Sequence, residues 1–148
     1  MTDIHTTATT PMPSTDDAML RLRRVIQTDV GLCAASGVVL VLGAGALADL
    51  ADVSGGGPIV AAGAFLLLLA GALTWLSRAP AEALVRLAPW SAEGDFAWVI
   101  GSVALAVAVS MSATGRVLLV TQAVVVAGMG AAKLAAHRNA RATIIGVR

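Results

Sequence analysis

The stretch PIVAAGAFLLLLAGALTWLS, residues 58–77, contains no charged side chain and lies in a run of 25 uncharged residues between Asp52 and Arg78. A helix that rises 1.5 Å per residue needs roughly 20 apolar residues to cross about 30 Å of hydrocarbon. Residues 65–69 are apolar all round, whereas a helix on the surface of a soluble bundle has a polar face. The stretch therefore predicts a transmembrane helix rather than an apolar core helix of a soluble bundle.

Three further uncharged runs extend outward from this stretch. They contain 19 residues after Asp29, 20 after Asp95 and 16 between Arg116 and Lys133. The last run is short, but the Lys133 ammonium can snorkel to the interface and so lengthen it. We expect an all-α polytopic membrane protein with four transmembrane helices in an up-down-up-down antiparallel bundle, because short connections make consecutive helices neighbours. The expected helices are residues 25–48, 58–77, 95–113 and 115–136.

The composition of the 148-residue chain supports a membrane protein and excludes several other classes. The chain is 57% hydrophobic and only 13% charged, and its net charge of +1 gives no reason to expect a nucleic-acid partner. The single cysteine, Cys33, excludes an internal disulfide and a site with several thiolates. His5 and His137 have no partner at ligand spacing, and no phosphate loop or nucleophile motif is present. We expect no enzyme, no metal and no cofactor.

The basic residues predict the orientation. Nine of the ten lie before the first helix, between the second and third, or after the fourth, and only Arg116 lies on the other side. The positive-inside rule places the nine, and both termini, in the cytoplasm. Residues 1–20 have no apolar core and predict a disordered tail, whether the chain starts at Met1 or Met19. Residues 21–137 form the expected membrane domain, and residues 138–148 a basic tail.

The two expected outer loops are short, whereas the expected cytoplasmic connector is longer. Residues 51–58 form a turn cluster, and residues 112–115 a very short loop. In the cytoplasmic connector, residues 77–94, Pro80 can start a short interfacial helix that Pro89 ends. A plain loop is the equally open alternative.

The two expected hairpins have similar patterns. Asp29 precedes Ser36 by seven residues, and Asp95 precedes Ser102 by the same spacing, which is about two helical turns and places each pair on one face. An internal duplication would insert both hairpins in the same orientation. Chance similarity among segments rich in Ala, Val, Leu and Gly is the alternative.

Five polar residues are the candidates for intramembrane sites: Asp29, Asp95, Gln122, Ser36 and Ser102. Intramembrane carboxylates often have a function. Both aspartates, however, begin helices near the cytoplasmic boundary, where the helix dipole and capping favour an acid. We favour capping and anchoring over proton or cation handling. Gln122 favours adhesion between helices, and the serines can bond to their own helix carbonyls.

The chain resembles a broad group of small, uncharacterised four-helix bacterial membrane proteins. The resemblance covers residues 20–140. It rests on Asp29 with Gly37 in the first helix, on Asp95-Phe96-Ala97-Trp98 opening the third, on Thr114-Gly115, and on Gln122-Ala123 followed by a basic tail. Members of the group often carry Asn in place of Asp95. The resemblance implies the four-helix fold and a place in the bacterial inner membrane, but no activity and no catalytic residue.

Three functions compete at this point. The first is a structural or accessory protein that binds lipid, a second copy of itself or another membrane protein, as the helices rich in small residues suggest. The second is a small oligomeric transporter or channel that uses Asp29 and Asp95. The third is a lipid- or quinone-binding module with Trp98 in a groove between the hairpins. The absence of a catalytic constellation favours the first.

Overall fold

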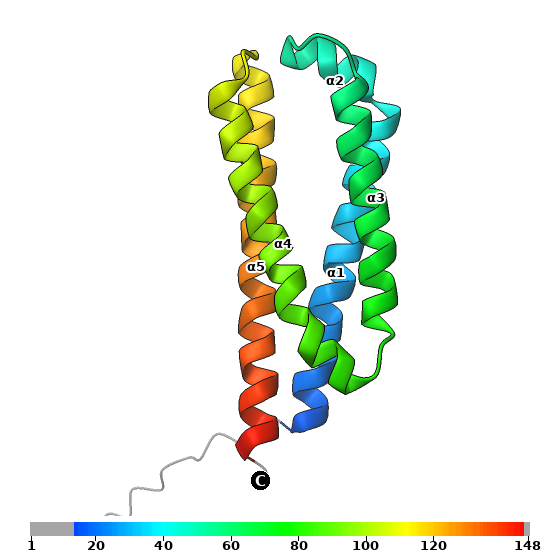
Figure 1. Ribbon diagram of the computed structural model, residues 1–148, viewed down its shortest axis with the longest axis vertical. Coiled ribbons are helices and arrows are strands. Elements are labelled where there is room, and N and C mark those ends of the chain that lie inside the picture. Colours follow the sequence, from blue (N-terminus) through cyan, green and yellow to red (C-terminus); the bar gives the residue numbers. More distant parts are fainter. Residues whose placement is uncertain (1–13, 147–148) are drawn as a thin grey trace, which may run out of the picture.

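The chain forms a bundle of long antiparallel helices, seen in a computed structural model that describes residues 14–146 (Figure 1). The helices are α1 (Thr15–Leu42), α2 (Ala44–Ala51), α3 (Gly57–Ser77), α4 (Ala81–Ala108) and α5 (Ala113–Gly146). Residues 14–146 contain no strand, and all helices except the short α2 are long and apolar enough to cross a membrane. The predicted all-α class with four spans is confirmed.

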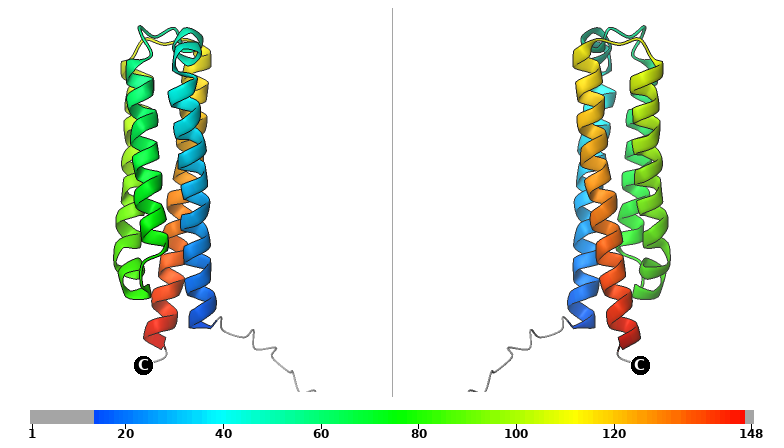
Figure 2. Two further views of the ribbon diagram at one scale, coloured as in Figure 1. Left: turned by 90° about the vertical axis from the view of Figure 1, so that its right-hand side faces the viewer. Right: turned by 90° about the vertical axis from the view of Figure 1, so that its left-hand side faces the viewer.

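The four long helices are arranged as two hairpins that meet mainly along one side. Helix α1 packs against α3, and α4 packs against α5, while α1 and α5 make the main contact between the two hairpins. Contact between α3 and α4 is sparse. The two side views show the long helices running nearly parallel over their whole length (Figure 2). The bundle is therefore closed on the α1–α5 side and open on the α3–α4 side.

Two glycines allow the close packing of α1 against α3. A Cβ added to Gly37 would lie 2.9 Å from the carbonyl oxygen of Gly63, and one added to Gly63 would lie 2.9 Å from the carbonyl oxygen of Gly37. Real Cβ atoms do not approach backbone oxygens this closely. Small residues serve the same purpose in other membrane helices, where van der Waals packing drives association. The first hairpin thus depends on this pair.

The upper end of the bundle in Figure 1 is closed by hydrogen bonds between the two hairpins. Gly43 separates α1 from the short α2, which ends at Asp52 with a positive φ of 54°. The Ser112 amide donates to the carbonyl of Ala51 at 2.8 Å, and its hydroxyl donates to that of Leu50 at 2.7 Å. The same hydroxyl accepts from the amide of Gly115 at 3.0 Å and so caps α5. Ser112 therefore joins the loops at this end.

Several helix boundaries differ from those expected. Helix α1 begins at Thr15, because Ser14 caps it by accepting from the amide of Asp17 at 3.2 Å, so the tail expected at 1–20 is helical from residue 15. The rest of that prediction lies outside the described residues. Helix α4 runs unbroken through Pro89, so the prediction that Pro89 ends a short helix is wrong. Bundle packing supplies the support that lets membrane helices tolerate an internal proline. Helix α5 likewise continues through the expected tail to Gly146.

Most of the helix surface is apolar and exposed. The most exposed of the large apolar side chains include Val107, Leu42 and Leu68, which are 83%, 82% and 75% exposed. A soluble bundle could not leave such surfaces in water, whereas hydrocarbon solvates them. The outer faces of the four long helices are thus suited to contact lipid.

A buried charge cluster between the two hairpins

A lysine lies between two aspartates in the interior of the bundle. The Lys133 ammonium, on α5, is 2.5 Å from a carboxylate oxygen of Asp29 on α1 and 2.7 Å from one of Asp95 on α4. Lys133 is only 1% exposed, and each aspartate is 4% exposed. We call these three residues the charge cluster. It brings together side chains from three of the four long helices.

The packing of α4 against α5 positions Asp95. Gly130 lies nearly one turn before Lys133 on α5, and a Cβ added there would be 3.2 Å from the Cβ of Asp95. The absence of a side chain at Gly130 lets the Asp95 carboxylate approach α5 at the level of the ammonium. The Asp95–Lys133 pair therefore lies within the second hairpin, whereas the Asp29–Lys133 pair joins the two hairpins.

The cluster contains one more acid than base. With all three groups ionised its net charge is −1, and a single proton on either carboxylate makes it neutral. Ionised groups at membrane depth are costly unless they are paired, and a buried charge left without a partner costs several kcal/mol. The arrangement thus provides a place where one additional positive charge is favourable.

Three further polar side chains lie near the cluster. The Cys33 thiol, one turn beyond Asp29 on α1, donates to the second carboxylate oxygen of Asp29 at 3.7 Å. His137 lies one turn after Lys133 on α5 and is 7% exposed, and its Nδ1 has no hydrogen-bond partner among the described residues. The indole nitrogen of Trp98, nearly one turn beyond Asp95, is also buried without a partner within residues 14–146. The polar interior therefore extends beyond the three charged groups.

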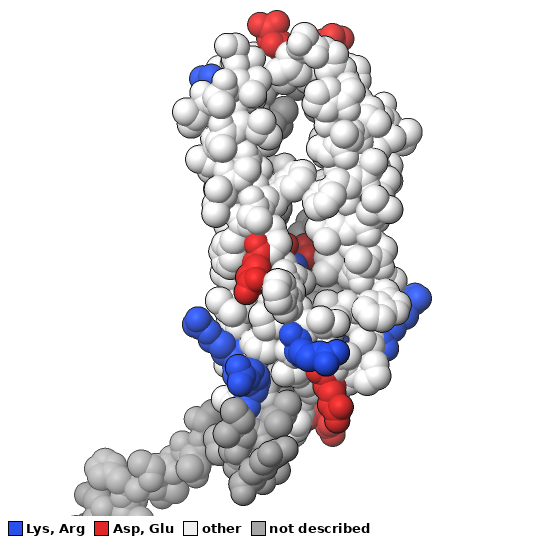
Figure 3. All heavy atoms as spheres, viewed as in Figure 1, with Lys and Arg blue, Asp and Glu red and all other residues white. Residues whose placement is uncertain are grey.

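A hollow lies between the two hairpins toward the upper end of the bundle. Figure 3 shows this opening over the upper half, with acidic and basic atoms visible at its lower end. The ring of Trp98 on α4 stacks on that of Phe65 on α3, with centroids 5.9 Å apart and an interplanar angle of 2°. This stack bridges the side of the bundle where α3 and α4 otherwise make few contacts.

The structure brings two of the predicted site residues into direct contact with one lysine. Asp29 and Asp95 meet at Lys133, but neither caps a helix, because the N-cap residues of α1 and α4 are Ser14 and Pro80. The capping interpretation is therefore wrong. Three candidates take no part in the ion pairs: Ser102 is buried, and Ser36 and Gln122 are half-buried.

The apolar pattern around Lys133 does not reveal its role. It predicts a side chain that snorkels to the interface, whereas the structure buries the ammonium between two carboxylates. The signal was present, because two aspartates and a lysine occur in three separate apolar segments at similar distances from the same end of the bundle. Opposite charges at the same depth satisfy one another in the interior of a bundle.

Fold and site together define the class of protein: a helical bundle whose four apolar spans are compatible with an integral membrane protein, with a charge cluster at its centre. Comparison with models of protein families, with curated proteins and with solved structures finds no match to this chain. No group of three or more metal-ligating side chains occurs in the described part of the chain. The charged groups themselves are therefore the basis for inferring a function.

Proposed function

We propose that the protein is a small transporter that carries protons across the bacterial cytoplasmic membrane, with both termini in the cytoplasm. The observation that carries this proposal is the position of Lys133 between Asp29 and Asp95, which leaves the cluster one positive charge short. The distribution of basic residues supports the orientation, because Lys and Arg gather near the lower end of the bundle, where α1 begins and α5 ends (Figures 1 and 3).

A proton suits this site better than a metal cation. Na⁺ or a divalent ion would need several oxygen ligands, but the cluster offers only two carboxylates, and the ammonium lies within 2.7 Å of both. A second cation at that position would also be repelled by the ammonium. A proton needs only one carboxylate oxygen, and its binding makes the site neutral.

Protonation would change the force that holds the two hairpins together. A proton on Asp29 removes the ion pair between α1 and α5, whereas a proton on Asp95 leaves the ammonium wholly to Asp29. The hairpins meet chiefly through α1 and α5 and make few contacts between α3 and α4. The proton's position can therefore bias the bundle between an open and a closed arrangement, which is what alternating access requires.

The proposal is tested by proton flux into vesicles that contain the purified protein and a pH-sensitive dye, driven by an imposed membrane potential. Asp95→Asn leaves a neutral Asp29–Lys133 pair and removes the site for the proton. We expect flux well above that of empty vesicles for the wild type and flux at the level of empty vesicles for Asp95→Asn. The matched control is Asp49→Asn, an exposed aspartate near the outer end, which should keep the wild-type flux.

The alternative is the structural or accessory role, and the same experiment distinguishes it from proton transport. It is supported by the same ion pair between the hairpins, which can fix how they pack, and by the large exposed apolar surface for a second copy or a partner. Wild-type flux no higher than that of empty vesicles, or unchanged flux in Asp95→Asn, would contradict proton transport and favour this role. Capture of a specific partner by crosslinking in native membranes would then support it.

One observation favours binding of a lipid or quinone near Trp98. Its indole N–H is buried without an acceptor within residues 14–146 and is free to donate to a ligand carbonyl. The ring face, in contrast, is occupied by Phe65. A bound quinone that copurifies with the wild type and is lost in Trp98→Phe, which keeps the stack, would support this function. Unchanged content of the bound species would count against it.

A further inference from the structure

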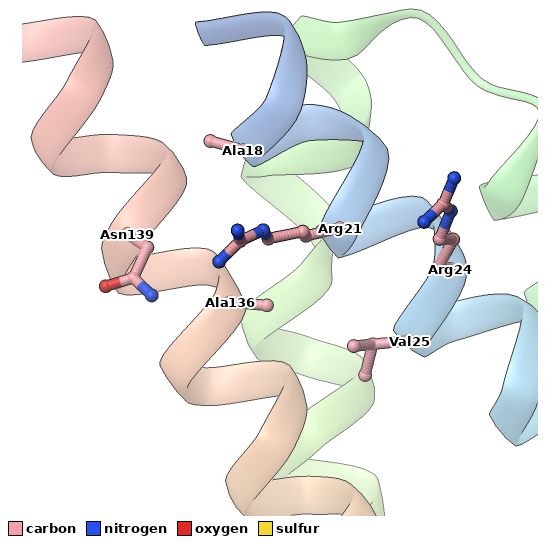
Figure 4. Close-up of a pocket in the computed structure, with 6 residues that line it drawn as sticks. All are labelled: Ala18, Arg21, Arg24, Val25, Ala136 and Asn139. Carbon is pink, nitrogen blue, oxygen red and sulfur yellow. The ribbon is translucent and has the colours of Figure 1, made fainter. Parts of the chain in front are cut away.

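A basic pocket lies between α1 and α5 at the cytoplasmic end of the bundle, separate from the charge cluster. Figure 4 shows Arg21 reaching from α1 toward Asn139 on α5. The pocket has an apolar part and a polar part, and its lining residues are Ala18, Arg21, Arg24, Val25, Ala136 and Asn139. It therefore spans the interface through which the two hairpins make their main contact.

The two arginines of this pocket differ from the arginine between them. Arg23 donates to the carbonyl oxygens of Ser77 and Ala79 and so caps the end of α3. Arg21 and Arg24 are exposed, and their side chains form no hydrogen bond or ion pair with any residue in the described part of the chain. Figure 4 shows that the Arg21 guanidinium reaches toward α5, whereas Arg24 extends from the other side of α1. The Arg21 guanidinium is thus available together with the amide of Asn139, and Arg24 adds a second positive charge at the edge of the pocket.

We propose that this pocket binds the phosphate of an anionic phospholipid from the cytoplasmic leaflet. Guanidinium groups present several N–H donors in a planar fork that matches phosphate oxygens, and an amide N–H₂ adds further donors. Basic pockets between transmembrane helices bind anionic head groups in this way. Val25 and Ala136 supply apolar surface at the point where the apolar span begins, which suits the glycerol and acyl parts of a lipid.

A lipid at this position would contact both hairpins at once. Its phosphate would bridge Arg21 of α1 and Asn139 of α5, which belong to different hairpins. The bound lipid would then stabilise the α1–α5 contact from the cytoplasmic side. This inference does not depend on proton transport, because it rests on a different set of residues.

The experiment measures lipid binding to delipidated protein in a neutral detergent by native mass spectrometry, with phosphatidylglycerol and phosphatidylcholine as the two probes. The wild type should bind one phosphatidylglycerol tightly and phosphatidylcholine much more weakly. The double variant Arg21→Gln/Arg24→Gln should lose about 30-fold in affinity for phosphatidylglycerol, or about fivefold for each arginine. The matched control, Arg78→Gln/Arg86→Gln, removes two other exposed arginines near the same end of the bundle.

A second variant distinguishes lipid binding in the pocket from general electrostatic attraction of the lipid to a basic surface. Ala136→Leu fills the apolar part of the pocket without changing any charge and should also weaken phosphatidylglycerol binding. Inorganic phosphate as a competitor should fail to displace the lipid, since it lacks the apolar part. The proposal is overturned if both lipids bind with equal affinity, or if the control pair loses as much affinity as the Arg21 and Arg24 pair. Full binding to Ala136→Leu would also overturn it. Displacement of the lipid by inorganic phosphate would overturn it as well and would indicate a soluble anion instead.

Discussion

Replacement of Lys133 by methionine should destabilise the protein more than any other single change in the charge cluster. At an effective dielectric constant of about 20, unit charges at the observed 2.5 and 2.7 Å attract by about 6 kcal/mol for each pair. Much of this gross attraction offsets the cost of burying the three ions. What remains after loss of the ammonium is two buried carboxylates without a counter-charge, a defect that costs about 3–5 kcal/mol. We expect Lys133→Met to lose this amount of unfolding free energy.

The measurement is reversible unfolding in mixed micelles of a mild detergent and sodium dodecyl sulfate, followed by the fluorescence of the three tryptophans. The control is the triple variant Asp29→Asn/Asp95→Asn/Lys133→Met, which removes all three charges and should stay within about 1–2 kcal/mol of the wild type. This rescue by further mutation is the signature of a buried charge left unpaired. A Lys133→Met variant within about 1 kcal/mol of the wild type, or a triple variant as unstable as the single one, would refute the reasoning.

The other predictions concern the packing of the two hairpins and use the same unfolding assay. Gly37→Ala places a Cβ against the backbone of Gly63 and should cost about 1–3 kcal/mol, whereas Gly31→Ala, where no atom lies within 4 Å, should be neutral or slightly stabilising. Equal effects would argue against the close helix crossing. Arg23→Gln removes the donors to the carbonyls that end α3 and should cost about 1.5–3 kcal/mol; a change below about 0.5 kcal/mol would show that water replaces them. Ser112→Ala removes the α5 cap and the bond to the other outer loop, and should cost about 1–2 kcal/mol; retention of full stability would rule out that connection.

The number and class of the helices follow from the sequence because transfer into lipid is a local property. A segment such as residues 58–77 favours hydrocarbon whatever its neighbours do, and backbone groups in lipid can be satisfied only by a helix within that segment. The four spans, the alternation of their direction and the all-α class are therefore predictable from apolar runs and turns. The ends of the helices are less predictable from the sequence. Pro89 is tolerated inside α4, because the surrounding bundle, not the proline alone, decides whether a helix continues.

The charge cluster depends on the tertiary structure. Asp29 and Asp95 are recognisable as intramembrane acids in the sequence, but their partner is not, since Lys133 can equally well reach the interface or turn inward. Its direction depends on the rotation of α5 about its own axis and on the approach of α4, which Gly130 permits. These are relations between helices, and an apolar pattern that is nearly uniform around each helix does not encode them. Hydropathy determines that a helix crosses the membrane, whereas interhelical packing determines which of its sides meets a neighbour, and so which charges pair.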